Sequence, residues 1–196
     1  MKEICFATNN KGKLEEIRKQ IGDQYKVLSL ADIGCFEELP ETQATIAGNS
    51  LQKAEFVNVK YSIDCFADDT GLEVDALNGA PGVISSRFAG PACDPDANMN
   101  LLLTLMQGVE NRSARFRTVI TLIIDGEMHQ FEGVCEGKIT HDKQGDKGFG
   151  YDPIFQAEGH RVSFAQLSVE EKNQISHRGK AAKKMVDFFH NQPIAK

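Results

Sequence analysis

The first part of the chain alternates between apolar runs and amphipathic segments. An apolar run at 3–7 predicts a buried strand, and residues 26–30 predict a second one. Between them, apolar residues recur at helical spacing over 13–22, and Gly22 is placed to end that helix. We therefore expect the order strand, helix, strand at the start of the chain.

A second helix is expected from 49 to about 61, with Asn49 as its capping residue. A short buried strand at 63–67 follows and leads into two adjacent carboxylates, Asp68 and Asp69. Aspartate is disfavoured inside strands, so we expect the strand to end there and a turn to follow.

The middle of the chain changes to an antiparallel pattern. Two glycines and a proline predict a loop at 79–83, and Asp94 followed by a proline marks the start of a helix. Residues 114–137 are typical of a long hairpin, since the Asp-Gly pair at 125–126 suits a two-residue turn with positive φ.

Two helices are expected near the end. Ser168 and Glu171 form a capping box for a short one, and apolar residues recur on one face over 179–190. Together the patterns predict one domain over 1–196 with an α/β fold, in which helices flank a mixed β-sheet.

The composition is that of an ordinary globular protein, with 41% hydrophobic and 26% charged residues. No apolar run is long enough to span a bilayer, and the first residues lack a signal-peptide pattern. The five cysteines are widely spaced and never form CxxC, which argues against disulfides or a zinc site. We therefore expect a cytoplasmic protein without a membrane partner.

The formal net charge is −6, which disfavours a general nucleic-acid binder. Any polyanion must instead meet a local cluster of cations. The segment ATNNKGK at 7–13 offers one at the start of a helix, where backbone N–H groups attract phosphate. Thr8 and Asn10 can donate hydrogen bonds there, and Lys11 and Lys13 add positive charge. The competing interpretation is a helix cap with solvated lysines. The segment does not match the Walker pattern GxxxxGK(S/T), which argues against a nucleotide-switch ATPase or GTPase.

The acidic pair offers a site for Mg²⁺, which prefers oxygen ligands and commonly takes one or two carboxylates. Glu41 could supply a further oxygen from another loop. The competing interpretation is a polar strand end with a turn. At the acidic pair the Asp-x-Asp pattern of haloacid-dehalogenase phosphatases is missing, because Thr70 stands where the second aspartate would follow Asp68. This weakens a haloacid-dehalogenase-type phosphatase as an alternative.

A third segment, GFGYDPIF at 148–155, could receive a nucleobase. Its glycines allow close approach to the backbone, and Phe149 or Tyr151 could stack on a base. The alternative is a turn whose aromatic side chains pack inward. Beyond it, three further possible donors gather near two helix ends: Lys172, His177 and Arg178.

Four segments occur in order along nearly the whole chain: ATNNKGKLEEI, ADDTGLEVDALNGAPGVISSRFAG, GFGYDPIF and LSVEEKNQISHRGKA. Together they resemble the motifs of the inosine triphosphate pyrophosphatase family, also called the Ham-type house-cleaning enzymes. Four ordered motifs are more specific than any one of them.

The resemblance implies two lobes around a central active-site cleft, a homodimer, and Mg²⁺-dependent hydrolysis of ITP, dITP and XTP to the monophosphate and pyrophosphate. By position, Glu41 and Asp69 are the implied metal ligands, and Asp69 and Asp68 the implied catalytic acids. The implied substrate-binding residues are Thr8, Asn9, Asn10, Lys11, Lys13, Lys53, Thr70, Phe149, Gly150, Tyr151, Asp152, Lys172, His177 and Arg178.

Two positions depart from the family pattern. Many members have glycine where this chain has Asn9, and many have glutamate where it has Gly48. Both aspartates of the acidic pair are present, but which of them binds the metal and which acts on the water stays open. A carboxylate bound to Mg²⁺ is a poor base, so Asp69 either coordinates while another group such as Asp68 takes the proton, or only orients the water.

Base selection has a direct chemical explanation. Inosine and xanthine carry a 6-oxo group that accepts hydrogen bonds, whereas the 6-amino group of adenine donates and would face the donors of Arg178. Two alternative functions remain: a Maf-type pyrophosphatase of other nucleotides, and a nucleotide-binding sensor without catalysis. The His-Arg pair at 177–178 argues against the first, and the intact set of acids and Lys13 against the second.

Overall fold

The structure is a computed structural model that describes residues 2–21 and 25–191, apart from the side chains of residues 11, 12, 16, 19 and 20. The chain divides into two compact units. The first unit takes residues 1–69, 118–132 and 181–196, and the second takes 70–117 and 133–180.

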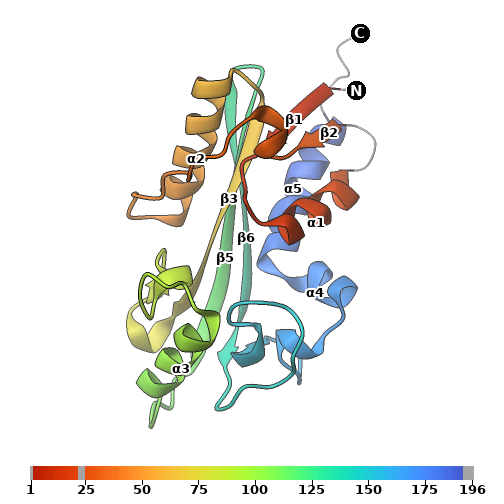
Figure 1. Cartoon of the computed structure of the whole chain (residues 1–196). Helices are drawn as coiled ribbons and strands as arrows, with labels where there is room; N and C mark the ends of the chain where they lie inside the picture. The colour runs from red at the N-terminus through yellow and green to blue at the C-terminus, as the bar shows by residue number, and fades with distance from the viewer. Residues whose placement is uncertain (1, 22–24, 192–196) are drawn as a thin grey trace. The chain divides into compact units, whose positions relative to one another are not determined.

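A mixed sheet runs through the fold (Figure 1). Within the described residues it has seven strands in the order β2-β1-β3-β5-β6-β7, with β4 added beside β3. β1 pairs in parallel with β2 and β3, whereas β4 and β7 pair antiparallel with β3 and β6. The strands are β1 (Lys2–Phe6), β2 (Tyr25–Leu28), β3 (Cys65–Val74), β4 (Pro81–Gly82), β5 (Ser113–Ile124), β6 (Glu127–Ile139) and β7 (Phe155–Ala157). The predicted α/β class with a mixed sheet is confirmed.

Five α-helices occur in the described part of the chain: α1 (Lys11–Ile21), α2 (Ile46–Tyr61), α3 (Pro95–Leu105), α4 (Val169–Ile175) and α5 (His177–Asn191). Two predicted starts are confirmed in atomic detail. Asp94 caps α3 by accepting from the next backbone N–H groups, and Ser168 and Glu171 form the reciprocal capping box of α4. No helix of residues 2–21 and 25–191 has the length and apolar character needed to cross a bilayer.

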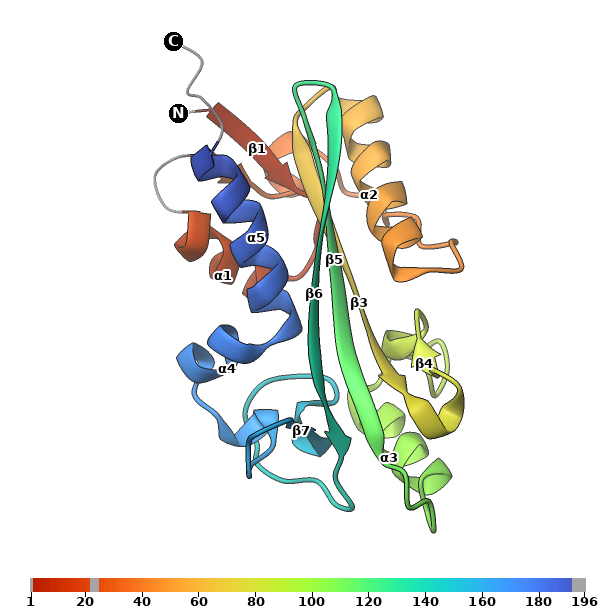
Figure 2. The same cartoon turned by 180° about the vertical axis from the view of Figure 1, so that it is seen from behind.

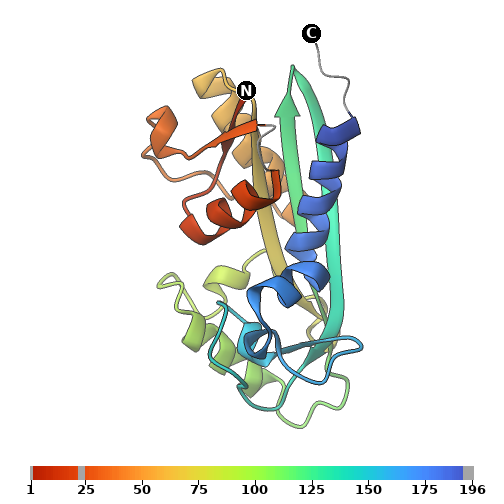
Figure 3. The ribbon, with the colours of Figure 1, turned by 90° about the vertical axis from the view of Figure 1, so that its right-hand side faces the viewer.

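In the first unit, alternation along the strands sends successive side chains to opposite faces of the sheet. Ile4, Phe6 and Phe66 pack with helices α1 and α5, while Cys5 and Ala67 pack with α2. Figures 1 and 3 show α1 and α5 side by side, with α2 on the other side of the strands. Both faces of β1 and β3 are therefore buried at residues 4–6 and 65–67, as these apolar runs require.

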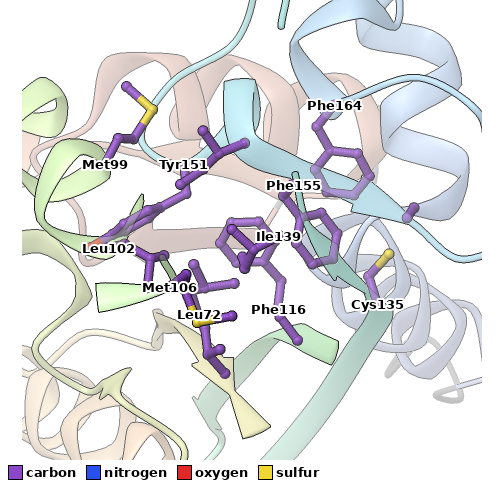
Figure 4. Packing of buried hydrophobic residues seen from close by; sticks show 14 of the residues in the cluster. Leu72, Met99, Leu102, Met106, Phe116, Cys135, Ile139, Tyr151, Phe155 and Phe164 are labelled. Atoms are coloured by element: carbon purple, nitrogen blue, oxygen red, sulfur yellow. The ribbon is translucent and has the colours of Figure 1, made fainter. Parts of the chain in front are cut away.

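The second unit has its own core around the beginning of β5 and the end of β6. Figure 2 shows the ribbon of these strand segments from behind. Aromatic rings dominate this core: Phe116 lies 4.7 Å from Phe155 and 6.0 Å from Phe164, centroid to centroid (Figure 4). Tyr151 is also buried there, and its hydroxyl donates to the Ser85 carbonyl at 2.7 Å. These contacts fix the glycine-rich segment 148–151 at its C-terminal end.

The hairpin prediction is confirmed at its turn. Asp125 and Gly126 have φ of 51° and 81° between β5 and β6, the positive pair that a two-residue type I′ turn requires. Glycine reaches this region without a Cβ penalty, and aspartate is among the few other residues that tolerate it.

Three expectations need correction. The helix expected from 49 begins at Ile46, and its cap is Thr45, whose hydroxyl oxygen accepts from Gly48 N–H. The strand expected to end at 67 continues without a turn through both aspartates to Val74. The loop at 79–83 contains the short strand β4, which pairs with β3. Gly22, expected to end the first helix, lies outside the described residues.

Candidate active site

In the first unit, β3 presents its two carboxylates to opposite faces of the sheet. Asp68 follows Phe66 on the face covered by α1, and it meets Lys13 from that helix. The Lys13 ammonium donates to both oxygens of Asp68, at 3.0 and 2.8 Å, and Asp68 is only 3% exposed. Lys13 is therefore not a solvated lysine, and the buried carboxylate has a charged partner.

Asp69 follows Ala67 on the face covered by α2, where it meets Lys53. The Lys53 Nζ lies 3.3 Å from Asp69 Oδ1 and 2.5 Å from Glu41 Oε1, so one ammonium joins both predicted metal ligands. The other oxygen, Asp69 Oδ2, is buried and has no hydrogen-bond partner among the described residues. Such an oxygen is costly to leave unsatisfied, and it suits a ligand that arrives later.

Burial and the neighbouring charges both shift the pKa values of Asp69 and Lys53. Burial raises the pKa of Asp69, and Glu41 and Asp68 raise it further, while Lys53 opposes the rise. For Lys53, burial by itself would lower the pKa, yet the three carboxylates hold it above its ordinary value. Lys53 is thus a firmly charged buried ammonium, which is found almost only beside carboxylates.

The loop that carries Glu41 is held against α2 by side chains one helical turn apart. Asn49 accepts from Gln43 N–H at 2.8 Å, and Gln52 both accepts from the backbone N–H of Thr42 and donates to its hydroxyl, at 2.9 and 2.8 Å. Our sequence analysis did not assign Asn49 or Gln52 to the site. Their spacing with Lys53 at i, i+3 and i+4 on one helix was the available signal.

The turn before α1 is organised by its own side chains. Thr8 Oγ1 accepts from Asn10 N–H at 3.2 Å, and Asn10 Oδ1 accepts from Lys13 N–H at 3.1 Å. The side-chain oxygen of Asn10 therefore caps the helix, while Asn9 is exposed. The side chain of Lys11 lies outside the described residues.

In the second unit, two cations face one exposed ring. Phe149 is 49% exposed; the Lys172 Nζ lies 4.7 Å and the Arg178 Cζ 5.4 Å from its centroid. Lys172 also donates to Asp152 Oδ2 at 2.5 Å, and the same oxygen accepts from Phe149 N–H at 2.9 Å. Of the two rings considered for base stacking, Phe149 is accessible and Tyr151 is part of the core.

Glycine is required at two points around these residues. A Cβ on Gly148 would lie 2.1 Å from Asp152 Oδ2, and one on Gly179 would lie 1.8 Å from the Asn173 carbonyl. Gly179 thus lets α5 begin immediately after α4, and this tight junction places Arg178 beside Phe149.

His177 and Arg178 are both buried at the start of α5. The His177 imidazole stacks on Phe116, with 4.5 Å between centroids, and an Arg178 Nη2 lies 3.5 Å from Thr70 Oγ1. The structure thereby brings Thr70, Phe149, Lys172 and Arg178 together, although they come from three separated segments of the sequence.

Within residues 2–21 and 25–191, no three His, Cys, Asp or Glu side chains gather as a preformed metal cluster. The donor set of Glu41 and Asp69 nevertheless fits Mg²⁺, which takes hard oxygen ligands and leaves other positions to water and phosphate. The buried, partnerless Asp69 Oδ2 supports this fit.

The chain is similar to known proteins over nearly its whole length. The dITP/XTP pyrophosphatase of Flavobacterium psychrophilum is 53% identical over 189 residues, covering 96% of this chain and all of that protein. That of Porphyromonas gingivalis is 51% identical over 190 residues, covering 96% and 98%. The solved Ham1 proteins of Staphylococcus aureus and Coxiella burnetii superpose with TM-scores of 0.92 and 0.93 at 37% and 34% identity, each covering 98% of this chain and all of the other. The model of the Ham1 family matches residues 4–188, and the chain therefore belongs to the Ham1 family.

Proposed function

We propose that the protein hydrolyses non-standard purine nucleoside triphosphates, namely dITP, XTP and ITP, to the monophosphate and pyrophosphate. The family and the names of the relatives support this reaction. The observation that carries it is the pairing of two lysines, one half-buried and one buried, with two adjacent carboxylates: Lys13 with Asp68 and Lys53 with Asp69. Phosphoryl transfer needs cations for the phosphate oxygens and carboxylates for a metal and a water.

The roles follow from the chemistry of each side chain. Lys13 and Lys53 donate to oxygens of the triphosphate and so stabilise the charge that develops on them. Glu41 and Asp69 hold Mg²⁺, which when bound supplies further positive charge at the phosphates. Their carboxylates are hard ligands, and the Glu41 loop is already fixed to α2.

Asp69 then cannot serve as an efficient base, because a bound cation lowers the pKa of its carboxylate. We assign to Asp68 the role of accepting a proton from the attacking water. The water oxygen forms a bond to the α-phosphorus, the bond from that phosphorus to the bridging oxygen breaks, and pyrophosphate leaves. The proton of the water passes to Asp68 and then to solvent. Lys13 holds the orientation of Asp68 until the substrate binds.

The second unit supplies the groups for the base. Phe149 stacks on the purine, while Arg178 donates to its 6-oxo group. Adenine carries a 6-amino donor at that position, so its binding would leave donors facing each other. Unpaired buried polar groups of this kind allow discrimination by several orders of magnitude.

The assembly and compartment belong to the same proposal. We expect a homodimer, as the family resemblance implies, and a cytoplasmic location. The five cysteines are all free thiols, which is consistent with a reducing compartment.

The test is pyrophosphate release from equal concentrations of ITP, XTP, dITP, GTP and ATP, with Mg²⁺ and with EDTA. Metal-dependent release confined to the non-standard purines is the expected result. In the same assay with UTP and CTP, release from these pyrimidine triphosphates instead would indicate a Maf-type activity. Tight binding of ITP without release would indicate a sensor.

A further inference from the structure

The Lys53 ammonium forms ion pairs with the two carboxylates that are expected to hold the metal. It contacts Glu41 Oε1 at 2.5 Å and Asp69 Oδ1 at 3.3 Å, and the Lys53 side chain is 7% exposed. A divalent cation on these two carboxylates would therefore lie beside the Lys53 ammonium, where Asp69 is buried and the Glu41 side chain is 36% exposed. Like charges repel strongly where water is largely excluded.

The loop geometry does not depend on this ammonium. Asn49 and Gln52 hold the two residues that follow Glu41, at positions 42 and 43, through three hydrogen bonds of their own. Glu41 therefore keeps its place when Lys53 moves. The Lys53 side chain is a flexible four-carbon stem on a fixed helix, so its ammonium can exchange one set of oxygens for another.

We propose that Lys53 gates the metal site: in the free enzyme its ammonium neutralises Glu41 and Asp69 and excludes divalent cations, and it leaves them only when a triphosphate offers it phosphate oxygens. The metal therefore binds together with the nucleotide and is not resident in the free enzyme. This inference rests on the proposed function. Asp69 Oδ2 is buried and has no hydrogen-bond partner among the described residues, and it would be available to the metal once Lys53 has left.

The charge count supports the exchange. With two carboxylates and one ammonium, each in its charged form, the group carries a net charge of about −1 in the free enzyme. When the triphosphate arrives it brings several negative charges, which Lys53 can neutralise while the metal replaces it on Glu41 and Asp69. Metal alone brings no such partner for the displaced ammonium.

The experiment is a titration of nucleotide-free protein with Mn²⁺, followed by electron paramagnetic resonance as a spectroscopic substitute for Mg²⁺. Lys53→Met keeps the length of the stem and removes the charge, and we expect it to bind Mn²⁺ about tenfold or more tightly than the wild type. Lys60→Met is the matched control: it removes the same charge from the same helix, at an exposed residue that pairs with Glu37. Its affinity for Mn²⁺ should equal that of the wild type.

Equal Mn²⁺ affinity of Lys53→Met and wild type would overturn the gate, and so would tight Mn²⁺ binding by the wild type. If circular dichroism shows that Lys53→Met is unfolded, lysine-selective NMR of the wild type decides the question. The Lys53 signal should stay in place with Mg²⁺ alone and move when a non-hydrolysable ITP analogue is added; a shift with Mg²⁺ alone contradicts the gate.

These results are distinct from the test of the proposed function. If the wild type releases pyrophosphate from ITP yet binds Mn²⁺ tightly without nucleotide, the proposed function stands and the gating role of Lys53 is wrong. A wild type that releases no pyrophosphate loses the function, whereas the comparison of Mn²⁺ affinities still shows whether Lys53 excludes the cation.

Discussion

Asp68 and Asp69 are neighbours in the chain, yet their carboxylates are bound on opposite faces of the sheet. Lys13 of α1 holds the first and Lys53 of α2 holds the second. Strand geometry separates them, because successive side chains in a strand point to opposite sides. The separation reduces their mutual repulsion and gives each a different partner. One carboxylate can therefore serve a metal while the other serves a water.

Replacing Asp69 by asparagine tests its role in turnover. We expect Asp69→Asn to lower kcat for ITP by about a hundredfold or more, since the neutral amide is a weaker ligand for Mg²⁺ than the carboxylate. Pyrophosphate release measures the loss, and the urea unfolding midpoint reports the fold. Asp187→Asn, at an exposed residue of α5 that pairs with Lys183, is the control and should keep wild-type activity. Wild-type kcat in Asp69→Asn would remove it from the mechanism.

The pH profile should show the raised pKa of Asp69. Burial is the main cause of this rise, followed by Glu41 and Asp68, with Lys53 opposing it. Asp69 acts as a ligand only when ionised, so kcat/KM should fall as the pH falls through this pKa, above the usual aspartate value of about 3.9. An acid limb at or below the usual aspartate range would contradict the prediction.

The same shift predicts a change in stability. A carboxyl whose folded-state pKa exceeds its unfolded value stabilises the fold below the unfolded pKa, and this contribution disappears as the pH rises through the folded pKa. At neutral pH, therefore, ionised Asp69 carries a cost of burial. We expect Asp69→Asn to unfold at no lower a urea concentration than the wild type at pH 7; a clear loss of stability would show that the Lys53 ion pair outweighs this cost.

Gln52 is expected to act on the metal through Glu41. Its side chain makes two hydrogen bonds to Thr42, so Gln52→Ala should loosen the loop and leave the fold intact. We expect the Mg²⁺ concentration for half-maximal activity to rise about tenfold, as is typical when the support of a metal ligand is removed. Gln107→Ala, at an exposed position, is the control. An unchanged Mg²⁺ requirement would mean that Gln52 does not help to position Glu41.

Phe149 is expected to contribute affinity by stacking on the base. Phe149→Leu keeps an apolar side chain but removes the ring, and KM for ITP should rise about tenfold, near the lower end of what stacking contributes. Phe36→Leu provides a matched control, because Phe36 is 86% exposed. If both variants bind ITP equally well, the exposed Phe149 ring is not the stacking surface.

Arg178 is expected to set the preference among bases. Removing its donors in Arg178→Ala should lower the ratio of kcat/KM for ITP to that for ATP by about tenfold or more. Thermal unfolding must accompany the assay, since Arg178 is 7% exposed and lies beside Phe149. An unchanged ratio in a folded variant would place selectivity elsewhere.

Much of the fold was predictable because the signals are local. The cap at Asp94, the capping box of Ser168 and Glu171, and the Asp-Gly turn at 125–126 each depend on residues within a few positions of one another. The pattern of α1 is local in the same way: Leu14, Ile17 and Ile21 repeat at helical spacing, and all three are buried.

The two errors around the site have a common cause. Charged residues normally argue against a strand, and that rule predicted an end at residue 67. The strand continues to Val74 because Lys13 and Lys53 neutralise its aspartates on the two faces. Asn49 was likewise taken for a cap, whereas it binds Gln43 from inside the helix. In both cases a tertiary partner outweighed a local preference.

The sequence by itself determined the class of fold, the order of most elements and, through four ordered motifs, the family. Only the tertiary structure decided which lysine meets which carboxylate, that Phe149 is exposed while Tyr151 is buried, and that Lys53 lies between Glu41 and Asp69. The physical reason is the sequence distance between the interacting residues. Caps, turns and periodicity depend on residues within a few positions of one another. The pairing of Lys13 with Asp68 joins residues 55 positions apart and depends on how α1 packs on the sheet.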